Sequence, residues 1–264
     1  MHTHLQIAIQ AAIEAGEAIM EIYQKDFEVE FKADDSPLTE ADQKANRVIM
    51  DYLDKTEFPI ISEENKQTDY QERKKWTSCW IVDPLDGTKE FIKKNGEFTV
   101  NIALVHNQKT NLGVIYVPAT KVLYFADAST ELAQKVQLDE PVFNLQFIQQ
   151  NAEAIQAKEN AKSLRIVGSR SHMNEDTTNF IESLKTDKEI EVVSKGSSLK
   201  FCLVADGDAD IYPRFAPTME WDTAAGQAIC KAVGLQVIDQ KTGKEMLYNR
   251  ENLLNNYFMV SNQK

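Results

Sequence analysis

Two aspartates, Asp83 and Asp86, follow an apolar run in the stretch WIVDPLDGTKEF (residues 80–91). Asp-Pro and Asp-Gly are ordinary turn dipeptides, so a turn after a strand would explain them without any function. A carboxylate at the end of a buried strand, however, needs a partner. Mg²⁺ binds oxygen ligands, typically carboxylates together with phosphate oxygens. We therefore expect both aspartates and the Leu85 carbonyl to hold metal ions.

Gly87 and Thr88 complete this stretch. Gly87 has no Cβ, so a phosphate can come close to the backbone. Thr88 is expected to begin a helix, whose first N–H groups and dipole favour a bound anion. The sequence thus predicts a turn that binds metal through its carboxylates and phosphate through its amides.

Carboxylates that could complete a metal site occur at two other places. Glu63 and Glu64 follow the stretch FPIIS, and Asp222 lies in EWDTAAG, near the start of an expected helix. Each has an ordinary structural explanation, since the glutamates could belong to a solvated loop and Asp222 could be a helix N-cap. The residues alone leave these alternatives open.

Charge and motifs narrow the classes of function. The chain has 264 residues and a formal net charge of −12, which argues against nucleic-acid binding because such surfaces are normally basic. An anionic substrate would then need another source of positive charge, and bound metal ions supply it. No G-x-x-x-x-G-K or G-x-G-x-x-G motif is present. The D-x-x-D-G-T spacing is one residue longer than the D-x-D-G-T of phosphatases with an aspartyl nucleophile.

Segments for membrane insertion or secretion are not evident. No stretch approaches the ~18 consecutive apolar residues of a membrane span, and the N-terminus lacks the pattern of a signal peptide. Three cysteines, Cys79, Cys202 and Cys230, fit reduced core residues in a cytoplasm. We expect a cytoplasmic protein without an integral membrane segment, and peripheral association with the inner membrane stays open.

The first part of the chain, residues 1–160, is predicted to be α+β and to carry the DPLDGT turn. Its expected elements are a helix over 5–23, a strand over 27–32, a helix beginning near Glu40 and a strand ending on Asp83.

An antiparallel meander is expected after the turn at Asn95-Gly96. The polar stretch 145–163 indicates a boundary near residue 160. Residues 161–264 then alternate between strand and helix patterns, which predicts an α/β part. DGDAD (206–210) fits a polar connection between a helix and a strand.

DPLDGTKEF followed by WDTAAG resembles the inositol monophosphatase superfamily of Mg²⁺-dependent, lithium-sensitive phosphatases. The likeness extends over nearly the whole chain, and it implies a layered αβαβα sandwich. DGTKEF is similar to the branch of bacterial 3'(2'),5'-bisphosphate nucleotidases, whereas inositol monophosphatases more often have DGTTNF. This branch removes the 3'-phosphate of adenosine 3',5'-bisphosphate, a by-product of sulfate assimilation. The resemblance is also carried by KADDSPLTEAD, ISEE, GSRSH, GSSLKFCLVADG and YPRFAPTMEWDTAAG.

The resemblance implies a set of metal ligands. One Mg²⁺ would be held by Glu63, Asp83 and the Leu85 carbonyl, and a second by Asp83, Asp86 and Asp222. A third ion, when present, would be held more loosely around Glu63. Several of these groups would also face the substrate phosphate.

Thr88 and Asp42 are implied to be the pair that takes the proton of the attacking water. The amides of Gly87 and Thr88 would hold phosphate oxygens. Asp42 also fits a capping box with Thr39, and both roles could coexist.

Groups that could bind the rest of the nucleotide lie in the second part of the chain. A lone histidine is more often structural, and a lysine on a helix is usually solvated, so these alternatives stay open. The candidates are Ser169, Arg170, His172, Ser197, Lys200 and Arg214.

Two other functions compete with a bisphosphate nucleotidase. The first is an inositol or sugar phosphatase of the same fold. For the nucleotidase itself, the analogue that carries a 5'-phosphosulfate stays open as a second substrate. The second is a non-catalytic regulator that binds metal or nucleotide. The intact set Glu63, Asp83, Asp86, Thr88 and Asp222 argues against a regulator, which has no chemical need for all five.

Overall fold

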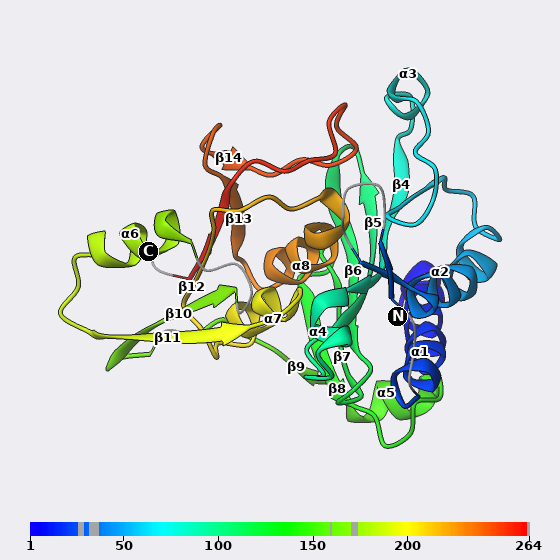
Figure 1. Ribbon diagram of the computed structural model, residues 1–264, viewed down its shortest axis with the longest axis horizontal. Coiled ribbons are helices and arrows are strands. Elements are labelled where there is room, and N and C mark those ends of the chain that lie inside the picture. Colours follow the sequence, from blue (N-terminus) through cyan, green and yellow to red (C-terminus); the bar gives the residue numbers. More distant parts are fainter. Residues whose placement is uncertain (26–28, 32–36, 159, 170–173, 263–264) are drawn as a thin grey trace.

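The computed structural model describes residues 1–25, 29–31, 37–158, 160–169 and 174–262. Two β-sheets and three groups of helices stack in the order α, β, α, β, α (Figure 1). α1 and α2 cover the outer face of the first sheet, α7 and α8 lie between the sheets, and α6 covers the far face of the second sheet. The layered αβαβα sandwich that the family resemblance implies is confirmed.

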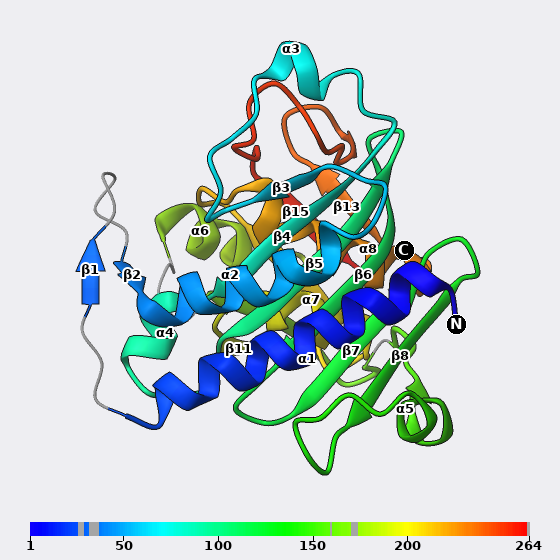
Figure 2. The same ribbon diagram turned by 90° about the vertical axis from the view of Figure 1, so that its right-hand side faces the viewer.

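The outer layer follows from an amphipathic sequence. In α1 (Thr3–Tyr23) the buried side chains recur every three or four residues, as predicted. α2 (Glu40–Leu53) begins at the predicted residue and lies beside α1 across the first sheet (Figure 2). Among the described residues, no helix has the length and apolar character needed to cross a membrane.

The first sheet contains the predicted antiparallel meander. β5 to β8 pair in sequence order, each antiparallel to the next, whereas β3 joins β4 in parallel. Across the sheet the strands are β3 (Ile60–Ser62), β4 (Ser78–Asp86), β5 (Thr99–His106), β6 (Lys109–Val117), β7 (Val122–Asp127), β8 (Leu132–Gln137) and β9 (Glu153–Ala154).

The strand predicted over 27–32 is described in part. β1 (Val29–Phe31) pairs with β2 (Pro37–Thr39) in a separate antiparallel ribbon, and residues 27, 28 and 32 lie outside the described residues. Three short helices were not assigned bounds by the sequence patterns: α3 (Tyr70–Arg73), α4 (Thr88–Ile92) and α5 (Leu145–Asn151). Of these, α4 begins at the residue expected from the DGT turn.

The second sheet is mixed rather than purely parallel. β10 pairs in parallel with β11 and β12, as strand–helix alternation predicts, but β15 inserts antiparallel between β12 and β13. Across the sheet the strands are β11 (Glu189–Lys195), β10 (Ser163–Ser169), β12 (Ile211–Arg214), β15 (Phe258–Ser261), β13 (Gln236–Asp239) and β14 (Lys244–Glu245). Its helices are α6 (Glu175–Ser183), α7 (Leu199–Ala205) and α8 (Glu220–Ala232).

α8 is buried between the two sheets and joins the two parts of the chain. It packs on β4, β5 and β6 of the first sheet and on β13 of the second. One hydrophobic cluster contains Ile81 and Ala103 of the first sheet together with Ile229 of α8. The three cysteines are buried and unpaired in this structure, as predicted for core residues. Because the parts share a core, a boundary near residue 160 stays a prediction.

Gly113 of β6 allows α8 to lie close to the first sheet. A Cβ at this position would come within 2.5 Å of the Ala225 carbonyl oxygen and 2.7 Å of the Ala228 Cβ. The Ala225 oxygen belongs to the helix backbone, so it cannot turn away as a side chain would. The position of α8, and of every residue on it, therefore depends on a glycine here.

We predict that Gly113→Ala destabilises the protein. Replacing glycine by alanine within a strand normally favours the fold by about 0.5–1 kcal/mol. Overpacking against α8 should outweigh this gain and cost about 1–3 kcal/mol of unfolding free energy. Denaturant unfolding of both proteins measures the difference. A variant that is as stable as wild type would show that β6 and α8 are not in this close contact.

Candidate metal-dependent active site

The DPLDGT stretch is part of a strand with an irregular register. The sequence predicts a strand that ends on Asp83, but β4 continues to Asp86, so this predicted end is wrong. Asp83 pairs with Asn101 of β5 and Asp86 pairs with Thr99, so three steps on β4 match two steps on β5. Side chains alternate between the two faces of a regular strand, so residues three positions apart normally point to opposite faces. An extra residue between them, as in a β-bulge, lets Asp83 and Asp86 point to the same face. The bulge therefore places both aspartates on one side of the sheet.

Asp222 joins these two aspartates from the other part of the chain. One carboxylate oxygen from each of Asp83, Asp86 and Asp222 lies within 4.8 Å of the others. Asp222 is the third residue of α8 and not its N-cap, which is Met219. Its Oδ2 accepts a hydrogen bond from the Met219 N–H at 2.7 Å. The structure thus confirms that the three predicted carboxylates meet.

In each of these aspartates, one carboxylate oxygen accepts hydrogen bonds from the protein. Asp83 Oδ1 accepts from the Leu85 N–H at 3.1 Å, and Asp222 uses Oδ2 as described. Asp86 Oδ2 accepts from the Ser198 N–H at 2.6 Å and from the hydroxyls of Ser197 and Ser198 at 2.8 and 2.7 Å. In the described part of the chain, no protein donor binds the second oxygen of any of the three. Each carboxylate is therefore fixed through one oxygen, and its second oxygen is available to a ligand.

The electrostatics of the cluster favour a bound cation. Burial and then the charges of Glu63, Asp86, Asp222 and Asp42 raise the pKa of Asp83 well above its ordinary value. Burial together with the charges of Asp86 and Glu63 raises the pKa of Asp222 to about 8. Within the described residues, the three aspartates of the cluster form no ion pair with lysine or arginine. An all-oxygen donor set with uncompensated negative charge fits Mg²⁺.

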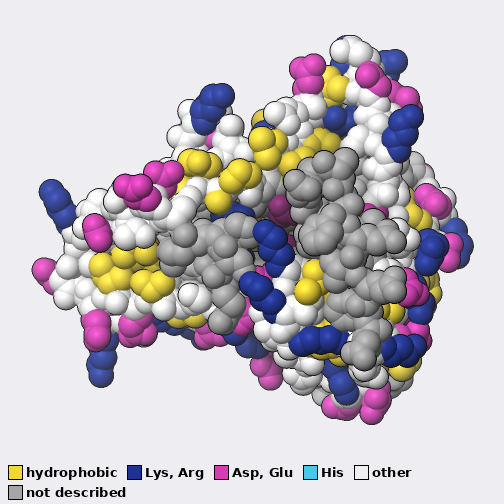
Figure 3. Space-filling model, in the orientation of Figure 1, with side chains coloured by type: hydrophobic (Ala, Val, Ile, Leu, Met, Phe, Trp, Pro, Cys, Tyr) yellow, Lys and Arg dark blue, Asp and Glu magenta, His cyan; other side chains and the backbone are white. Residues whose placement is uncertain are grey.

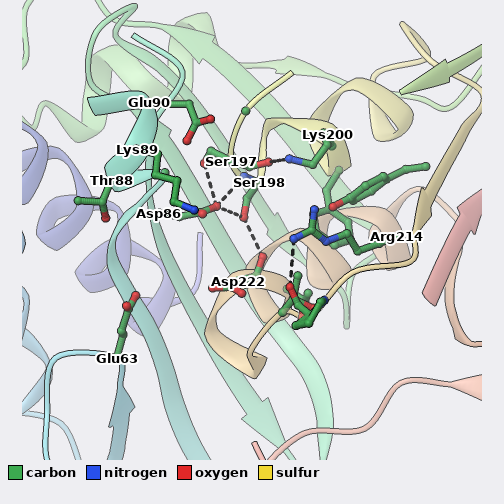
Figure 4. A pocket seen from close by; sticks show the side chains of 17 residues that line it. Glu63, Asp86, Thr88, Lys89, Glu90, Ser197, Ser198, Lys200, Arg214 and Asp222 are labelled. Atoms are coloured by element: carbon green, nitrogen blue, oxygen red, sulfur yellow. Dashed lines mark hydrogen bonds between the residues drawn. The ribbon is translucent and has the colours of Figure 1, made fainter. Parts of the chain in front are cut away.

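Glu63 faces the same space from the turn after β3. It lines the pocket with Asp86 and Asp222, and its carboxylate points into it (Figure 4). Its backbone N–H binds the Val82 carbonyl at 3.2 Å, which ties the turn to β4. Glu64 is not among the residues that line the pocket. Glu63 and not Glu64 therefore faces the pocket, and the role of Glu63 as a metal ligand stays a prediction.

Thr88 and Asp42 are in contact. The Thr88 hydroxyl lies 3.3 Å from Asp42 Oδ1 and 3.4 Å from the Leu85 carbonyl oxygen. Asp42 is buried in the first turn of α2, with 2 % of its surface exposed. The fold thus brings together the pair that the resemblance implied, although they are 46 positions apart in sequence. Their role in proton transfer stays a prediction.

The pocket in front of the cluster has a volume of about 260 Å³ and lies between the two sheets. Acidic side chains lie in a recess near the centre of the face in Figure 3, with basic side chains beside it. The predicted residues Gly87, Ser197, Lys200 and Arg214 line this pocket. Lining residues that the sequence interpretation did not include are Lys89, Glu90, Gly196, Ser198, Phe201, Tyr212, Pro217, Thr218 and Thr223. Several of these additional lining residues are next to a predicted site residue in the sequence, and this proximity is the signal that could have indicated them.

Lys200 and Arg214 are buried cations on the wall opposite α4 (Figure 4). The Lys200 ammonium donates to the Ser197 carbonyl and, at 3.5 Å, to the Lys195 carbonyl. Burial lowers the pKa of Lys200 to about 8. Arg214 donates to the Pro217 carbonyl at 3.1 Å, while its buried Nε has no partner among the described residues. The alternative of a solvated surface lysine is therefore wrong for Lys200.

The remaining candidates can be placed only in part. Ser169 is the last residue of β10. Arg170 and His172 lie outside the described residues. DGDAD (206–210) connects α7 to β12, as predicted, and its Asp210 forms an ion pair with Arg165 at 2.9 Å.

Comparisons with known proteins agree with this geometry. The family model described as "Inositol monophosphatase family" matches residues 1–264. The chain is 43% identical over 262 residues to "3'(2'),5'-bisphosphate nucleotidase CysQ" of Salmonella typhimurium, covering 97% of this chain and 99% of that protein. It is 44% identical to the protein of the same name in Escherichia coli K12, covering 96% and 97%.

A solved structure has the same fold. The crystal structure of CysQ from Bacteroides thetaiotaomicron, described as a bacterial member of the inositol monophosphatase family, superposes with a TM-score of 0.88. The two chains are 48% identical, and the match covers 99% of this chain and 98% of the other. With the family model matching the whole chain and relatives above 40% identity over nearly its full length, the chain belongs to the inositol monophosphatase family.

Proposed function

We propose that this protein is a Mg²⁺-dependent phosphomonoesterase that removes the 3'-phosphate of adenosine 3',5'-bisphosphate, giving AMP and phosphate. The names of the relatives support the substrate. The observation that carries the reaction type is the cluster of Asp83, Asp86 and Asp222, of which one carboxylate oxygen each lies within 4.8 Å of the others, with Asp86 and Asp222 lining the pocket. Buried cations on the opposite wall fit a substrate with a second phosphate.

Two Mg²⁺ ions fit the donor set, with a third held more loosely. Glu63, Asp83 and the Leu85 carbonyl would hold the first, and Asp83, Asp86 and Asp222 the second. Bound Mg²⁺ would acidify a water molecule and neutralise charge that develops on the phosphate and the leaving oxygen. The oxygens left without a protein donor in the three aspartates are the groups available for this role.

The chain supplies the proton acceptor and the orientation of the phosphate. Thr88 donates its hydroxyl proton toward Asp42, so the lone pairs of Thr88 are free to accept a hydrogen bond from water. Asp42 is the carboxylate that would receive the proton through this hydroxyl. Gly87 adopts φ +90°, and its amide and that of Thr88 would bind phosphate oxygens.

Selection among phosphate esters must come from the other wall, because the metal ligands and the DGT turn can bind any monoester. Arg214 has an unpaired donor and a planar guanidinium suited to phosphate, and Lys200 adds a buried positive charge. Ser169, His172 and Ser197 stay predictions for further contacts with the nucleotide. A place in sulfate assimilation and a location in the cytoplasm also stay predictions.

Phosphate release from a panel of esters tests the proposal. Wild-type protein with Mg²⁺ should hydrolyse adenosine 3',5'-bisphosphate with a higher kcat/KM than inositol 1-phosphate or a sugar phosphate. A preference for inositol 1-phosphate would identify an inositol phosphatase. The absence of turnover on every ester would favour the non-catalytic regulator.

Mg²⁺ should raise the melting temperature, and Asp83→Asn should reduce that rise. At a separation of ~5 Å and an effective dielectric of ~20, two carboxylates repel by about 3 kcal/mol. Because the folded protein raises the pKa of Asp83, ionisation of Asp83 costs stability at neutral pH when no metal is bound. The variant should therefore melt higher than wild type without Mg²⁺ and respond less to Mg²⁺.

Thermal melts across a Mg²⁺ titration measure both effects. Asp51→Asn is the matched control, since it removes an exposed carboxylate of α2 that does not line the pocket. It should respond to Mg²⁺ like wild type. Equal responses of wild type and Asp83→Asn would contradict the ligand assignment.

Lithium should inhibit the reaction at fixed Mg²⁺. The family resemblance implies that Li⁺ takes the place of the second metal ion, which Asp222 would help to hold. Phosphate release is measured while LiCl is raised, and KCl at the same concentrations controls for ionic strength. Activity that stays constant across the LiCl titration would count against the placement of the second ion.

Arg214→Ala should lower kcat/KM for adenosine 3',5'-bisphosphate by about ten- to a hundredfold, as expected for loss of a charge-assisted hydrogen bond. It should barely change kcat/KM for inositol 1-phosphate. Lys200→Ala should lower both values, because it also releases the Ser197 carbonyl. Lys93→Ala, an exposed lysine of the same chain, is the control. Equal losses on both substrates for Arg214→Ala would indicate a role in the scaffold instead.

A further inference from the structure

The direction of the Asp222 carboxylate depends on a single backbone group. Its Oδ2 is held by the Met219 N–H at 2.7 Å, and this bond decides where the other oxygen points. A shift of the Met219 backbone would therefore turn the Asp222 carboxylate relative to Asp83 and Asp86. Whatever fixes residues 218–220 also fixes this part of the metal site.

A short pairing with the chain segment 253–255 fixes this backbone. The Glu220 N–H donates to the Leu253 carbonyl at 2.9 Å, and the Asn255 N–H donates to the Thr218 carbonyl at 2.8 Å. The side-chain amide of Asn255 also donates to the Met219 carbonyl at 2.7 Å. Asn255 thus holds the Thr218–Met219 peptide group, whose N–H orients Asp222, and also the peptide group that follows it.

Glu220 and Arg250 hold the segment itself in place. The Glu220 carboxylate is fully buried and accepts from the N–H groups of Asn249 and Arg250, at 2.6 and 3.1 Å, and from Arg250 Nε at 3.0 Å. The same guanidinium donates through NH2 to Asn255 Oδ1 at 2.7 Å. One arginine therefore connects the first residue of α8 with the side chain that holds Met219.

We propose that Arg250 and Asn255 are positioning residues that set the affinity of the site for a divalent cation. They act through Glu220 and the Met219 backbone on Asp222, and neither lines the pocket. Residues that orient the ligands of a metal typically change its affinity by 10- to 100-fold when removed. The inference rests on the proposed metal-dependent function only in requiring that Asp222 binds a metal ion.

The chain contains a matched control for this network. Arg165 binds the buried carboxylate of Asp210 through Nε at 3.0 Å and NH2 at 2.9 Å, and Asp210 also accepts from the Arg165 N–H at 2.8 Å. Both arginines are partly buried, and both carboxylate partners are fully buried. The Arg165 pair lies outside the pocket lining and has no hydrogen bond to residues 218–222 among the described residues. Its loss should therefore destabilise the fold without turning Asp222.

The experiment measures Mg²⁺ binding without substrate. Wild type, Arg250→Ala, Asn255→Ala and Arg165→Ala are titrated with Mg²⁺ by calorimetry and by thermal melts. We expect Arg250→Ala and Asn255→Ala to raise the Mg²⁺ concentration at half-saturation about tenfold or more. Arg165→Ala should lower the melting temperature as much as Arg250→Ala, yet leave half-saturation within about twofold of wild type.

The possible outcomes separate this inference from the proposed function. The same Mg²⁺ concentration at half-saturation in all four proteins would overturn the inference. So would a rise of this concentration in Arg165→Ala as large as in Arg250→Ala, because a general loss of stability would then explain the weaker binding. If Arg250→Ala does not fold, Asn255→Ala decides the question, since it leaves no buried charge unpaired. Wild type that binds no Mg²⁺ would overturn both proposals. Metal binding with the expected differences but without hydrolysis of any ester would overturn the proposed function alone.

Discussion

Repulsion between closely spaced carboxylates is the constraint on which this structure depends. Asp83, Asp86 and Asp222 lie within 4.8 Å of one another, with Glu63 and Asp42 close enough to raise the pKa of Asp83. No hydrophobic or backbone interaction removes that cost, so the fold must hold these groups in place by other means. The hydrogen bonds to one oxygen of each aspartate serve this purpose. They also leave the second oxygen of each aspartate without a donor among the described residues, so it is available to a cation that would remove the repulsion.

Two features of the scaffold bring the charges together. The bulge in β4 turns Asp83 and Asp86 to one face, and the close approach of α8 at Gly113 brings Asp222 to the same place. Gly113 does not line the pocket, whereas the bulge ends on Asp86, which does. Both belong to the regular layers of the sandwich, which is why a metal site can be built from residues that are far apart in sequence. The Glu220–Arg250–Asn255 network extends this support to the first turn of α8.

The pocket separates chemistry from selection. β4 and α4 carry Asp83, Asp86 and the DGT turn, and Glu63 and the α8 residue Asp222 lie beside them; these groups suit any phosphate monoester. The wall formed by α7 and β12 carries Lys200 and Arg214, both buried in a protein of net charge −12. Burying a cation without a carboxylate partner is costly. Their location therefore fits a pocket that receives a second anionic group together with the phosphate to be cleaved.

The sequence by itself determined the residue types of the site and most elements around it. The aspartates of DPLDGT could be found because a carboxylate after an apolar strand needs a partner, whereas the family resemblance picked out Glu63 and Asp222 and assigned the set to two ions. The helix over 5–23 followed from apolar periodicity, the helix near Glu40 from a capping pattern, and the meander from apolar segments after the Asn95-Gly96 turn. Only the tertiary structure decided that β4 continues to Asp86 through a bulge, and that β15 enters the second sheet antiparallel. Only it showed that Lys200 is buried on the Ser197 carbonyl and that Asn255 and Arg250 support Asp222. These depend on register and on contacts between distant segments, which local residue patterns do not encode.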